Sequence, residues 1–517
     1  MTSLLPLVQE NLRSALWFRP ELALTAGTIV LFLLDLLWKR SAARVAYLTA
    51  AALAVVAVAA GLLWQQPPDA QALFNGMVAN DAFACFFKWL FLGAGALTIL
   101  IAAQGRDFPP ARIGQFYALL TAIVLGMFLM ASATDLLMMY MAIELVSMVS
   151  YVLSGFRKGD RKATEASLKY VIYGGVASGV MLFGMSYLYG LTGSTGFFEL
   201  GHRLMGLQAS GLPLAATRVA LVVGIVFVAA GVGYKVAAVP FHMWCPDVYE
   251  GAPTPFTAFL SVGPKAAGFA LALRFFLSVF AGPSSPVTGL AQALGGIPWP
   301  AVIGVVSAVT MTLGNLTALA QTNLKRLLAY SSIAHAGYTL MGLCAVSDRG
   351  MQAVMIYMLV YLVMNLGAFL TVIWVAETTG SESILDYKGL KRRAPLAAVS
   401  LAIFLFSLTG LPPFAGFAGK WYLFYALFER IPGPGGGWYA ILLLVGALNT
   451  AVSLFYYVRI IRAMFIDPPY VADPAPLAPK PGYALMAGAF SAAILIFGVW
   501  WSPLIAWTEA SLQLFRG

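Results

Sequence analysis

Six basic residues lie inside long apolar stretches, where a charged side chain can do chemistry that a surface lysine cannot. They are Lys88, Lys169, Lys235, Lys265, Arg274 and Lys420. A basic group within a bilayer is costly and marks a functional site by default. Glu144 is set equally deep, nine residues after Asp135, which is roughly 14 Å along a helix. Amines and a carboxylate of this kind suit proton transfer, because each can hold or release a proton.

Two of these lysines stand beside prolines. Lys235 precedes Pro240, and Lys420 follows Pro412 and Pro413. Proline donates no backbone hydrogen bond and disfavours a straight helix. A helix broken inside a membrane is tolerated only when it is buried in protein or lines a wet cavity. We therefore expect Lys235 and Lys420 to lie at two broken helices.

Two histidines accompany the buried charges. His242 follows Lys235 by seven residues, or two turns of a continuous helix, and histidine titrates near neutral pH and suits a proton relay. An interfacial histidine at a helix end is an equally good interpretation of His242. His335 stands mid-helix beside Ser331 and Ser332. It is either a relay residue or a core histidine with its hydrogen bonds satisfied.

The remaining buried charges also allow structural interpretations. Glu144 could be half of a structural ion pair, and Lys265 could snorkel, although its central position disfavours this. Lys169 could snorkel to the cytoplasmic side, but we expect it to reach Glu144 on the preceding helix and to set its protonation. Arg274 is near a helix end and is expected to snorkel. The sequence suggests no role for Lys88.

Two further acids are expected to be structural. Asp35 stands three residues before Trp38 and can reach the membrane interface. Asp135 begins a helix and suits its N-terminus.

Composition points to a membrane as the solvent of this chain. Of the 517 residues, 61% are hydrophobic and 10% are charged, against about 25% charged in soluble domains. The net charge of +10 is dispersed over short loops, which argues against a nucleic-acid partner. Three separated cysteines and three histidines exclude an iron–sulfur site in this chain and leave a haem site improbable. We expect no cofactor in this chain.

Fourteen segments are long and apolar enough to cross a bilayer, which needs about 20 residues. Their approximate ranges are 20–38, 43–64, 80–103, 113–132, 135–156, 163–190, 218–241, 254–280, 298–321, 325–346, 350–377, 395–429, 438–465 and 482–511. The segment 395–429 is too long for one straight helix and is expected to be broken. The longest connections, 191–217 and 466–481, are expected to be plain connectors or partner-binding surfaces.

The basic residues of the loops indicate the orientation. The loops after the odd-numbered helices hold 18 lysines and arginines, and those on the opposite side hold 7. The positive-inside rule then places both termini on the non-cytoplasmic side of a bacterial plasma membrane. The N-terminus lacks a basic region before its apolar run and does not resemble a cleaved signal peptide.

The two broken helices suggest internal repeats. Helices 4–8, at 113–280, and helices 9–13, at 298–465, would be two antiporter-like repeats. Five helices is an odd number, so successive copies enter from opposite sides and are inverted. Residues 1–112 would form helices 1–3, and residues 482–511 would form helix 14. The expected fold is thus an all-α polytopic membrane protein of fourteen transmembrane helices.

Four stretches carry a resemblance to a known family. They are DLLMMYMAIELVSMVSYVL with EASLKYVIYGG, YKVAAVPFHMWCPDVYEGAPTPFTAFLSVGPKAAGFA, TNLKRLLAYSSIAHAGY and LPPFAGFAGKWYLF. In this order they resemble the N subunits of proton-pumping NADH-quinone oxidoreductase, respiratory complex I. The match covers helices 4–13. The segment PDVYEGAPTP is its most specific part, since it separates the N subunits from the L and M subunits and the Mrp antiporters.

The resemblance implies a function in proton translocation. It places six residues at positions that are proposed to form a line of charges along the middle of the membrane: Glu144, Lys169, Lys235, Lys265, His335 and Lys420. His242 would lie beside this line. NADH, FMN, iron–sulfur clusters and quinone would bind to other subunits. The implied partners are subunits A, H, J, K, L and M, especially K and M, together with lipid.

The expected mechanism starts at Lys235. Neutral Lys235 would take a proton from the cytoplasmic side, through water and His242, while Glu144 is ionised nearby. The proton would pass by Lys265 and His335 to Lys420 and leave on the outer side. A stand-alone cation/proton antiporter is the alternative, and a structural scaffold or a solute symporter would explain the buried lysines less well.

Overall fold

A computed structural model describes residues 4–38, 43–67, 71–209, 215–280, 299–433, 436–469 and 480–514. The first part of the chain forms α1 (Leu4–Trp17), α2 (Arg19–Leu37), α3 (Arg44–Trp64), a hairpin of β1 (Gln71–Leu73) and β2 (Val78–Asn80), and α4 (Ala82–Gln104). The middle forms α5 (Ile113–Ser132), α6 (Leu136–Ser154), α7 (Arg161–Thr192), α8 (Phe197–Ala209), α9 (Ala215–Val236), α10 (Trp244–Gly251) and α11 (Thr254–Phe280).

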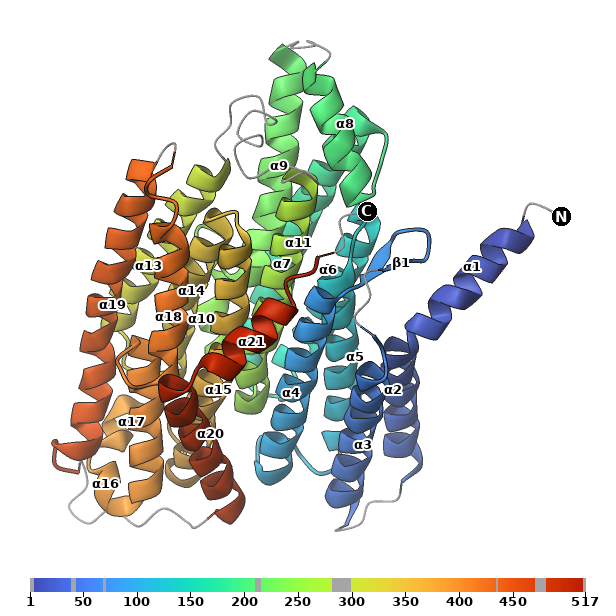
Figure 1. Cartoon of the computed structure of the whole chain (residues 1–517). Helices are drawn as coiled ribbons and strands as arrows, with labels where there is room; N and C mark the ends of the chain where they lie inside the picture. Colours follow the sequence, from blue (N-terminus) through green and yellow to red (C-terminus); the bar gives the residue numbers. More distant parts are fainter. Residues whose placement is uncertain are drawn as a thin grey trace.

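The last part forms α13 (Trp299–Leu319), α14 (Leu324–Cys344), α15 (Asp348–Thr379), the 3₁₀ turn η1 (Ile384–Tyr387), α16 (Leu390–Arg393), α17 (Pro395–Thr409), α18 (Ala415–Phe428), α19 (Gly436–Phe465), α20 (Pro481–Val499) and α21 (Ser502–Ala510). Most long helices lie side by side along one direction (Figure 1).

Polar caps set where several of these apolar helices begin. Asp135 and Asn323 cap α6 and α14 by accepting hydrogen bonds from backbone amides of the first turn. Asp81 and Ser347 do the same for α4 and α15. Each cap satisfies an amide that has no partner within its helix. The expectation that Asp135 belongs to a helix N-terminus is confirmed.

Within the described ranges, twelve helices are long and apolar enough to cross a membrane. They match twelve of the fourteen expected segments. Helix α14 is not among them, and α17 and α18 are too short individually. The chain is therefore a mostly helical, multi-span membrane protein.

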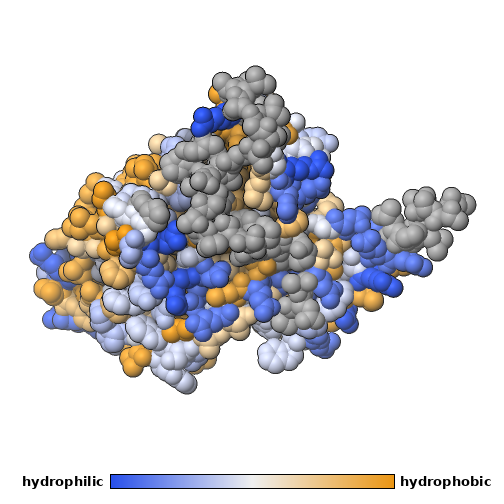
Figure 2. All heavy atoms as spheres, turned by 45° about the horizontal axis from the view of Figure 1, so that its top comes forward, coloured by the Kyte–Doolittle hydropathy of each residue, from blue (hydrophilic) through white to orange (hydrophobic). Residues whose placement is uncertain are grey.

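Two helices form the centre of the bundle. Every residue of α11 is buried, and α15 is buried along most of its length. α2, α3 and α19 lie outside and expose leucines, valines and isoleucines. Figure 2 shows hydrophobic residues along a flank, and hydrophilic residues on the end turned toward the viewer. This distribution is expected of a bundle whose sides face lipid, since lipid tails solvate apolar side chains.

Both expected broken helices are found. Helix α9 ends at Val236 and the chain resumes helix at α10, while α17 ends at Thr409 and α18 begins at Ala415. Ala237 has a positive φ of 60° and Gly410 one of 88°. A left-handed residue ends a right-handed helix. The break after Lys235 is therefore a true interruption of the helix.

Several boundaries differ from the expectation. The expected connector 191–217 contains α8, and the expected helix 482–511 is two helices that divide at Trp500 and Trp501. Pro503 stands in the first turn of α21, where a proline is tolerated but does not continue a preceding helix. Helix α1 and the β1–β2 hairpin were not expected. Most of the connector 466–481 lies outside the described residues.

Candidate functional site

Seven lysine and arginine side chains are buried in the part of the chain that the structure describes. Four of them form ion pairs with carboxylates: Arg44 with Asp35 at 2.6 Å, Lys88 with Glu21 at 2.7 Å, Arg274 with Asp81 at 2.7 Å, and Lys325 with Glu382 at 3.1 Å. The other three, Lys235, Lys265 and Lys420, form no ion pair within these ranges and bond only neutral groups. The unpaired amines are thus a distinct class.

Three discounted charges form buried ion pairs. Arg274 does not snorkel, because its guanidinium is fully buried and donates two hydrogen bonds to Asp81. Asp35 is buried and pairs with Arg44 at the start of α3. Lys88, for which no role was expected, pairs with Glu21 of α2. These three pairs tie α2, α3, α4 and α11 together.

Lys235 lies in the last turn of α9, and its side chain crosses to α6. Its Nζ donates a 2.9 Å hydrogen bond to Ser147 Oγ. Glu144 is one turn before Ser147 on α6 and is close enough to Lys235 to act on it electrostatically. The Glu144 side chain is half-buried, and its Oε1 has no hydrogen-bond partner within the described chain. Glu144 and Lys235 therefore form one local unit.

Lys169 does not reach Glu144 as expected. Its ammonium lies 2.6 Å from carboxylate oxygens of both Asp247 and Glu165, and its side chain is 37% exposed. Asp247 also accepts a 2.6 Å hydrogen bond from Arg326. Burial raises the pKa of Asp247, but the hydrogen bonds from Lys169 and Arg326 lower it further, so its pKa is below the usual value. The prediction was wrong because Glu165 of α7 itself and Asp247 of α10 hold the ammonium, and the sequence pattern did not place α10 near α7.

His242 is buried in the break between α9 and α10, and its Nδ1 has no hydrogen-bond partner in the described residues. The spacing of two helical turns from Lys235 is not realised, because the helix ends at Val236. His242 is thus near the broken helix but not stacked beneath Lys235.

Lys265 is on the buried helix α11. Its Nζ donates a 2.5 Å hydrogen bond to Ser332 Oγ of α14 and lies 5.6 Å from the centre of the Tyr249 ring. Gly268, one turn further along α11, packs against the side chain of Lys235, where an added Cβ would come within 3.3 Å of Lys235 Cγ. The absence of a side chain at Gly268 lets the Lys235 stem lie against the helix that carries Lys265.

Helix α14 connects Lys265 to Lys420. Ser332, His335 and Tyr338 are spaced by three residues, so they lie on neighbouring positions of one face. His335 is bonded through Nδ1 to the Tyr357 hydroxyl, and its Nε2 lies 3.3 Å from the Tyr457 hydroxyl. It is close enough to both Lys265 and Lys420 for electrostatic interaction. His335 is thus placed between the two lysines.

Lys420 lies in the first half of α18 and reaches back across the break. Its Nζ donates a 2.8 Å hydrogen bond to the Thr409 carbonyl at the end of α17 and lies 4.3 Å from the centre of the Tyr338 ring. Carbonyls at a helix C-terminus lack partners within the helix and favour cations. Gly410 leaves room for the Lys420 stem, because an added Cβ would meet Lys420 Cδ at 2.8 Å.

Glu144, Lys235, Lys265, His335 and Lys420, here called the series, stand on α6, α9, α11, α14 and α18 in that order, with Ser332 bonded to Lys265 and Tyr338 against Lys420. Lys169 is outside it, at the surface. The side chains that sequence reasoning missed are Ser147, Tyr249 and Tyr338, and Ser332 was noticed only as a neighbour of His335. A hydroxyl one turn from a buried charge is a signal that could have found Ser147.

Comparisons with known proteins identify the family of this chain. The model of the family "NADH:quinone oxidoreductase/Mrp antiporter, TM" matches residues 133–448, which include every residue of the series. The chain is 80% identical to NADH-quinone oxidoreductase subunit N of Anaeromyxobacter sp. strain Fw109-5 over the full length of both proteins. It is 44% identical to NADH-quinone oxidoreductase subunit N 2 of Sorangium cellulosum, over 99% of this chain and 100% of that protein.

A solved structure also matches. A chain of respiratory complex I from Thermus thermophilus, with bound aureothin, superposes with a TM-score of 0.74 at 30% identity, covering 94% of this chain and 98% of that chain. The chain therefore belongs to the NADH:quinone oxidoreductase/Mrp antiporter membrane family, and within it to subunit N of NADH-quinone oxidoreductases.

Proposed function

We propose that this chain carries a proton channel in the membrane arm of an NADH-quinone oxidoreductase and that Glu144, Lys235, Lys265, His335 and Lys420 carry the protons. The observation behind the proposal is the contrast among the buried bases. Among the described residues, Lys235, Lys265 and Lys420 form no ion pair, and only Lys235 has a carboxylate, Glu144, acting on it from nearby, whereas the four buried bases outside the series are ion-paired. A buried ammonium without a counter-ion is costly, so such an amine can both accept and release a proton.

The transfer starts at the Glu144–Lys235 unit. Neutral Lys235 accepts a proton from the cytoplasmic side, with His242 in the adjacent break as a relay, and ionised Glu144 stabilises the ammonium that forms. When a neighbouring subunit changes the charge near Glu144, this stabilisation is lost and the proton moves to Lys265. Ser332 and His335 then link Lys265 to Lys420, from which the proton leaves on the outer side.

Lys169 has a different part in this proposal. Because it bonds Asp247 and Glu165 at the surface, it acts on the series only through the α7–α10 contact. It remains a candidate for proton uptake, since it lies at the end of the bundle where α7 and α14 begin. The connections 105–112 and 155–160 and the segment 388–394, which contains α16, belong to this end, here called the basic end. We place the basic end in the cytoplasm and both termini outside.

The proposed partners are those that the resemblance to the N subunits implies. NADH oxidation, FMN, the iron–sulfur clusters and quinone reduction belong to other subunits, and the chain contacts the other membrane subunits A, H, J, K, L and M, chiefly K and M, and lipid. Helix α6 supports one contact: Leu137, Met141 and Met148 form an exposed apolar stripe with Glu144 between them. A subunit docked on this stripe could sense the charge of Glu144.

We further propose fourteen transmembrane helices arranged around two inverted repeats, α5–α11 and α13–α19. Counting α14 and the pair α17–α18 as spans raises the twelve apolar helices to fourteen. Two similarities support the repeats. Helices α7 and α15 each have 32 residues and end at a left-handed glycine, Gly193 or Gly380. The fourth span of each repeat is a broken helix.

The test is proton pumping and NADH-quinone turnover in membranes that carry Lys235→Ala, with assembly checked on a native gel. We expect both activities to fall in an assembled complex. The matched control removes a paired buried lysine together with its acid, Lys88→Met with Glu21→Gln, and should leave pumping intact. Normal pumping and turnover in assembled Lys235→Ala would contradict the proposal. A stand-alone cation/proton antiporter would instead retain transport without the NADH-oxidising subunits.

A further inference from the structure

Within the described ranges, Lys325 is a buried lysine in the first turn of α14, at the basic end. The sequence assigns it to a loop with other basic residues, yet its side chain is 0% exposed. Its Nζ lies 3.1 Å from Glu382 Oε1 and donates a 3.0 Å hydrogen bond to the Ala252 carbonyl. Glu382 is 23% exposed and lines a cavity of about 600 Å³ at the basic end. The carboxylate of Glu382 therefore stands between this cavity and the buried ammonium.

The cavity itself is polar and charged. Its lining includes Arg106, Asp107, Arg157, Glu250 and Glu382. These side chains come from segments that are far apart in the sequence, and their charges favour water in the cavity. A cavity of this size holds many waters. The Glu382 carboxylate thus connects the water of the cavity with the buried Lys325 ammonium.

The backbone holds Glu382 firmly in this position. Leu324 N donates to Glu382 O at 2.9 Å, and Ile384 N donates to Thr322 O at 3.0 Å. Asn323 Nδ2 adds a 3.3 Å hydrogen bond to Glu382 Oε2. The segments 322–324 and 382–384 therefore form a short antiparallel bridge that joins the start of α14 to the residues after α15.

The first half of the chain builds the same bridge without the ion pair. Leu136 N donates to Thr195 O at 2.9 Å, and Phe197 N donates to Thr134 O at 2.8 Å. The residue that corresponds to Lys325 is Leu137, and the one that corresponds to Glu382 is Thr195. The same backbone bridge thus forms with an exposed leucine and a threonine in the first half, so the bridge itself does not require an ion pair. A buried ion pair rarely stabilises more than an apolar pair would.

Polar groups lead inward from Lys325 toward Lys265. Ser332, the hydrogen-bond partner of Lys265, is seven residues after Lys325 on α14, or roughly 10 Å along nearly the same face. On α11, Thr257 Oγ1 shares the Ala252 carbonyl with Lys325, and Ser261, one turn further in, accepts a 2.5 Å hydrogen bond from Asn365 of α15.

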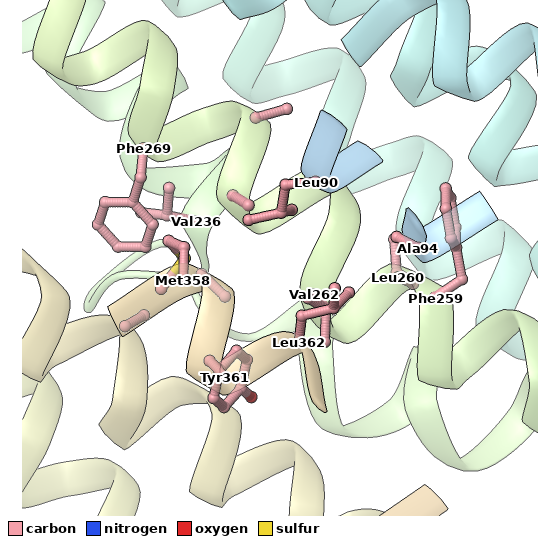
Figure 3. Close-up of a cluster of buried hydrophobic side chains, with 14 of the residues drawn as sticks. Leu90, Ala94, Val236, Phe259, Leu260, Val262, Phe269, Met358, Tyr361 and Leu362 are labelled. Atoms are coloured by element: carbon pink, nitrogen blue, oxygen red, sulfur yellow. The ribbon is translucent and has the colours of Figure 1, made fainter. Parts of the chain in front are cut away.

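Three buried oxygens in this region have no hydrogen-bond partner in the described chain: Tyr249 Oη, Tyr361 Oη and Asn365 Oδ1. The Tyr249 ring lies next to the Lys265 ammonium, and the centres of the Tyr361 and His335 rings are 5.2 Å apart. Figure 3 shows Tyr361 with Met358 and Leu362 of α15 beside Val262 of α11. Buried polar atoms are satisfied by ordered water where protein offers no partner. Water in this region would bridge the space between Lys325 and Lys265.

We infer that Glu382 and Lys325 form a proton intake of their own for Lys265, separate from the one that loads Lys235. Glu382 takes a proton from water in the cavity and becomes a carboxylic acid, which releases the Lys325 ammonium. Lys325 passes one of its protons inward through bridging water to the neutral Lys265 amine. The proton on Glu382 then moves to the Lys325 amine and restores the ion pair. One proton enters from the cavity and one reaches Lys265, so the charge of the pair is unchanged.

The test exchanges the pair for the residues that the first half uses at the same turn. Lys325→Leu with Glu382→Thr should fold and assemble, because Leu137 and Thr195 support the same backbone bridge. We expect NADH-quinone turnover and pumping to fall by about tenfold or more, since relay groups contribute this much or more to proton transfer. Asp467→Asn, which removes a carboxylate paired with Arg462 outside this cavity, is the control and should leave both rates unchanged.

A second variant separates a relay from a structural effect. Glu382→Gln keeps the shape of the side chain and removes only its proton acceptor. Its turnover should be low and should recover when a small weak acid such as formate, which can carry protons into the cavity, is added. A structural defect would not respond to formate. Full turnover in assembled Glu382→Gln, or a defect that formate leaves unchanged, would overturn the inference.

This inference rests on the proposed proton channel, and the two can fail separately. If Lys235→Ala abolishes pumping while the Lys325 and Glu382 variants pump normally, the channel stands and the second intake is wrong. If Lys235→Ala itself pumps normally, the channel proposal fails first.

Discussion

Lys265 on α11 donates a 2.5 Å hydrogen bond to Ser332 on α14, and this bond joins the two halves of the chain. Ser332 is nine residues after the cap Asn323, as Glu144 is nine residues after the cap Asp135. The same helical position thus holds a carboxylate beside Lys235 in the first half and a neutral hydroxyl beside Lys265 in the second. Lys265 thus has no carboxylate at the helical position from which Glu144 acts on Lys235.

This relationship predicts the effect of a carboxylate at position 332. Ser332→Glu should hold Lys265 in its charged form and slow NADH-quinone turnover and pumping by tenfold or more, because a paired ammonium releases its proton reluctantly. Ser332→Ala removes the hydrogen bond without adding a charge and should have a smaller effect. Turnover in assembled complexes measures both. Equal rates in the wild type and Ser332→Glu would show that Lys265 transfers no proton.

The Glu144–Lys235 unit predicts a non-additive response. Glu144→Gln and Lys235→Ala should each reduce pumping strongly. The double variant should be little worse than either single variant, since residues that act as a unit show strong coupling. Pumping rates of the three variants and the wild type give the coupling. Additive losses would mean that the two residues serve separate steps.

The buried Arg274–Asp81 pair predicts a loss of stability rather than of activity. Arg274→Met removes the guanidinium that pairs with the fully buried Asp81 carboxylate and should cost about 3–5 kcal/mol. Arg274→Met with Asp81→Asn should recover much of this, because the amide oxygen can still accept the hydrogen bond from Ala84 N that caps α4. Thermal unfolding in detergent measures the difference. The exposed pair of Arg462 and Asp467 is the control, where Arg462→Met should cost at most about 1 kcal/mol.

The surface cluster around Asp247 predicts a dependence on acid. Its pKa in the folded protein is below the usual 3.8, because the hydrogen bonds from Lys169 and Arg326 outweigh burial. A carboxylate with a lowered folded pKa stabilises the fold above its unfolded pKa, and this contribution is lost as pH falls through the folded pKa. The wild type should therefore lose stability below about pH 4. Asp247→Asn should be less stable at pH 7 and should show a shallower loss in acid, as measured by unfolding temperature against pH.

The close packing of Gly416, in the first turn of α18, against α17 predicts that a larger side chain is not tolerated at this position. A Cβ at Gly416 would lie 1.8 Å from the backbone oxygen of Ser407, which cannot move without displacing α17. Gly416→Ala should cost about 1–3 kcal/mol and slow pumping, because Lys420 would move away from the Thr409 carbonyl. Gly175→Ala is the control, since a Cβ there meets nothing within 4 Å. Normal pumping by Gly416→Ala would show that the position of Lys420 tolerates displacement.

The sequence by itself determined the solvent of this protein, most of its helices and both helix breaks. Apolar runs of about 20 residues and prolines act locally, so these features need no knowledge of neighbouring segments. It also singled out Lys235, Lys265 and Lys420, because a charge in an apolar run is anomalous wherever the helix packs.

The tertiary structure alone decided which charges pair. Lys169 bonds Asp247, Arg274 bonds Asp81 and Lys325 bonds Glu382, and each partner comes from a distant part of the chain. The difference between a lysine with a counter-ion and one with only a hydroxyl or a carbonyl determines how readily it releases a proton. That difference depends on which helix faces bring side chains within about 3 Å, and helical periodicity within one segment carries no such information.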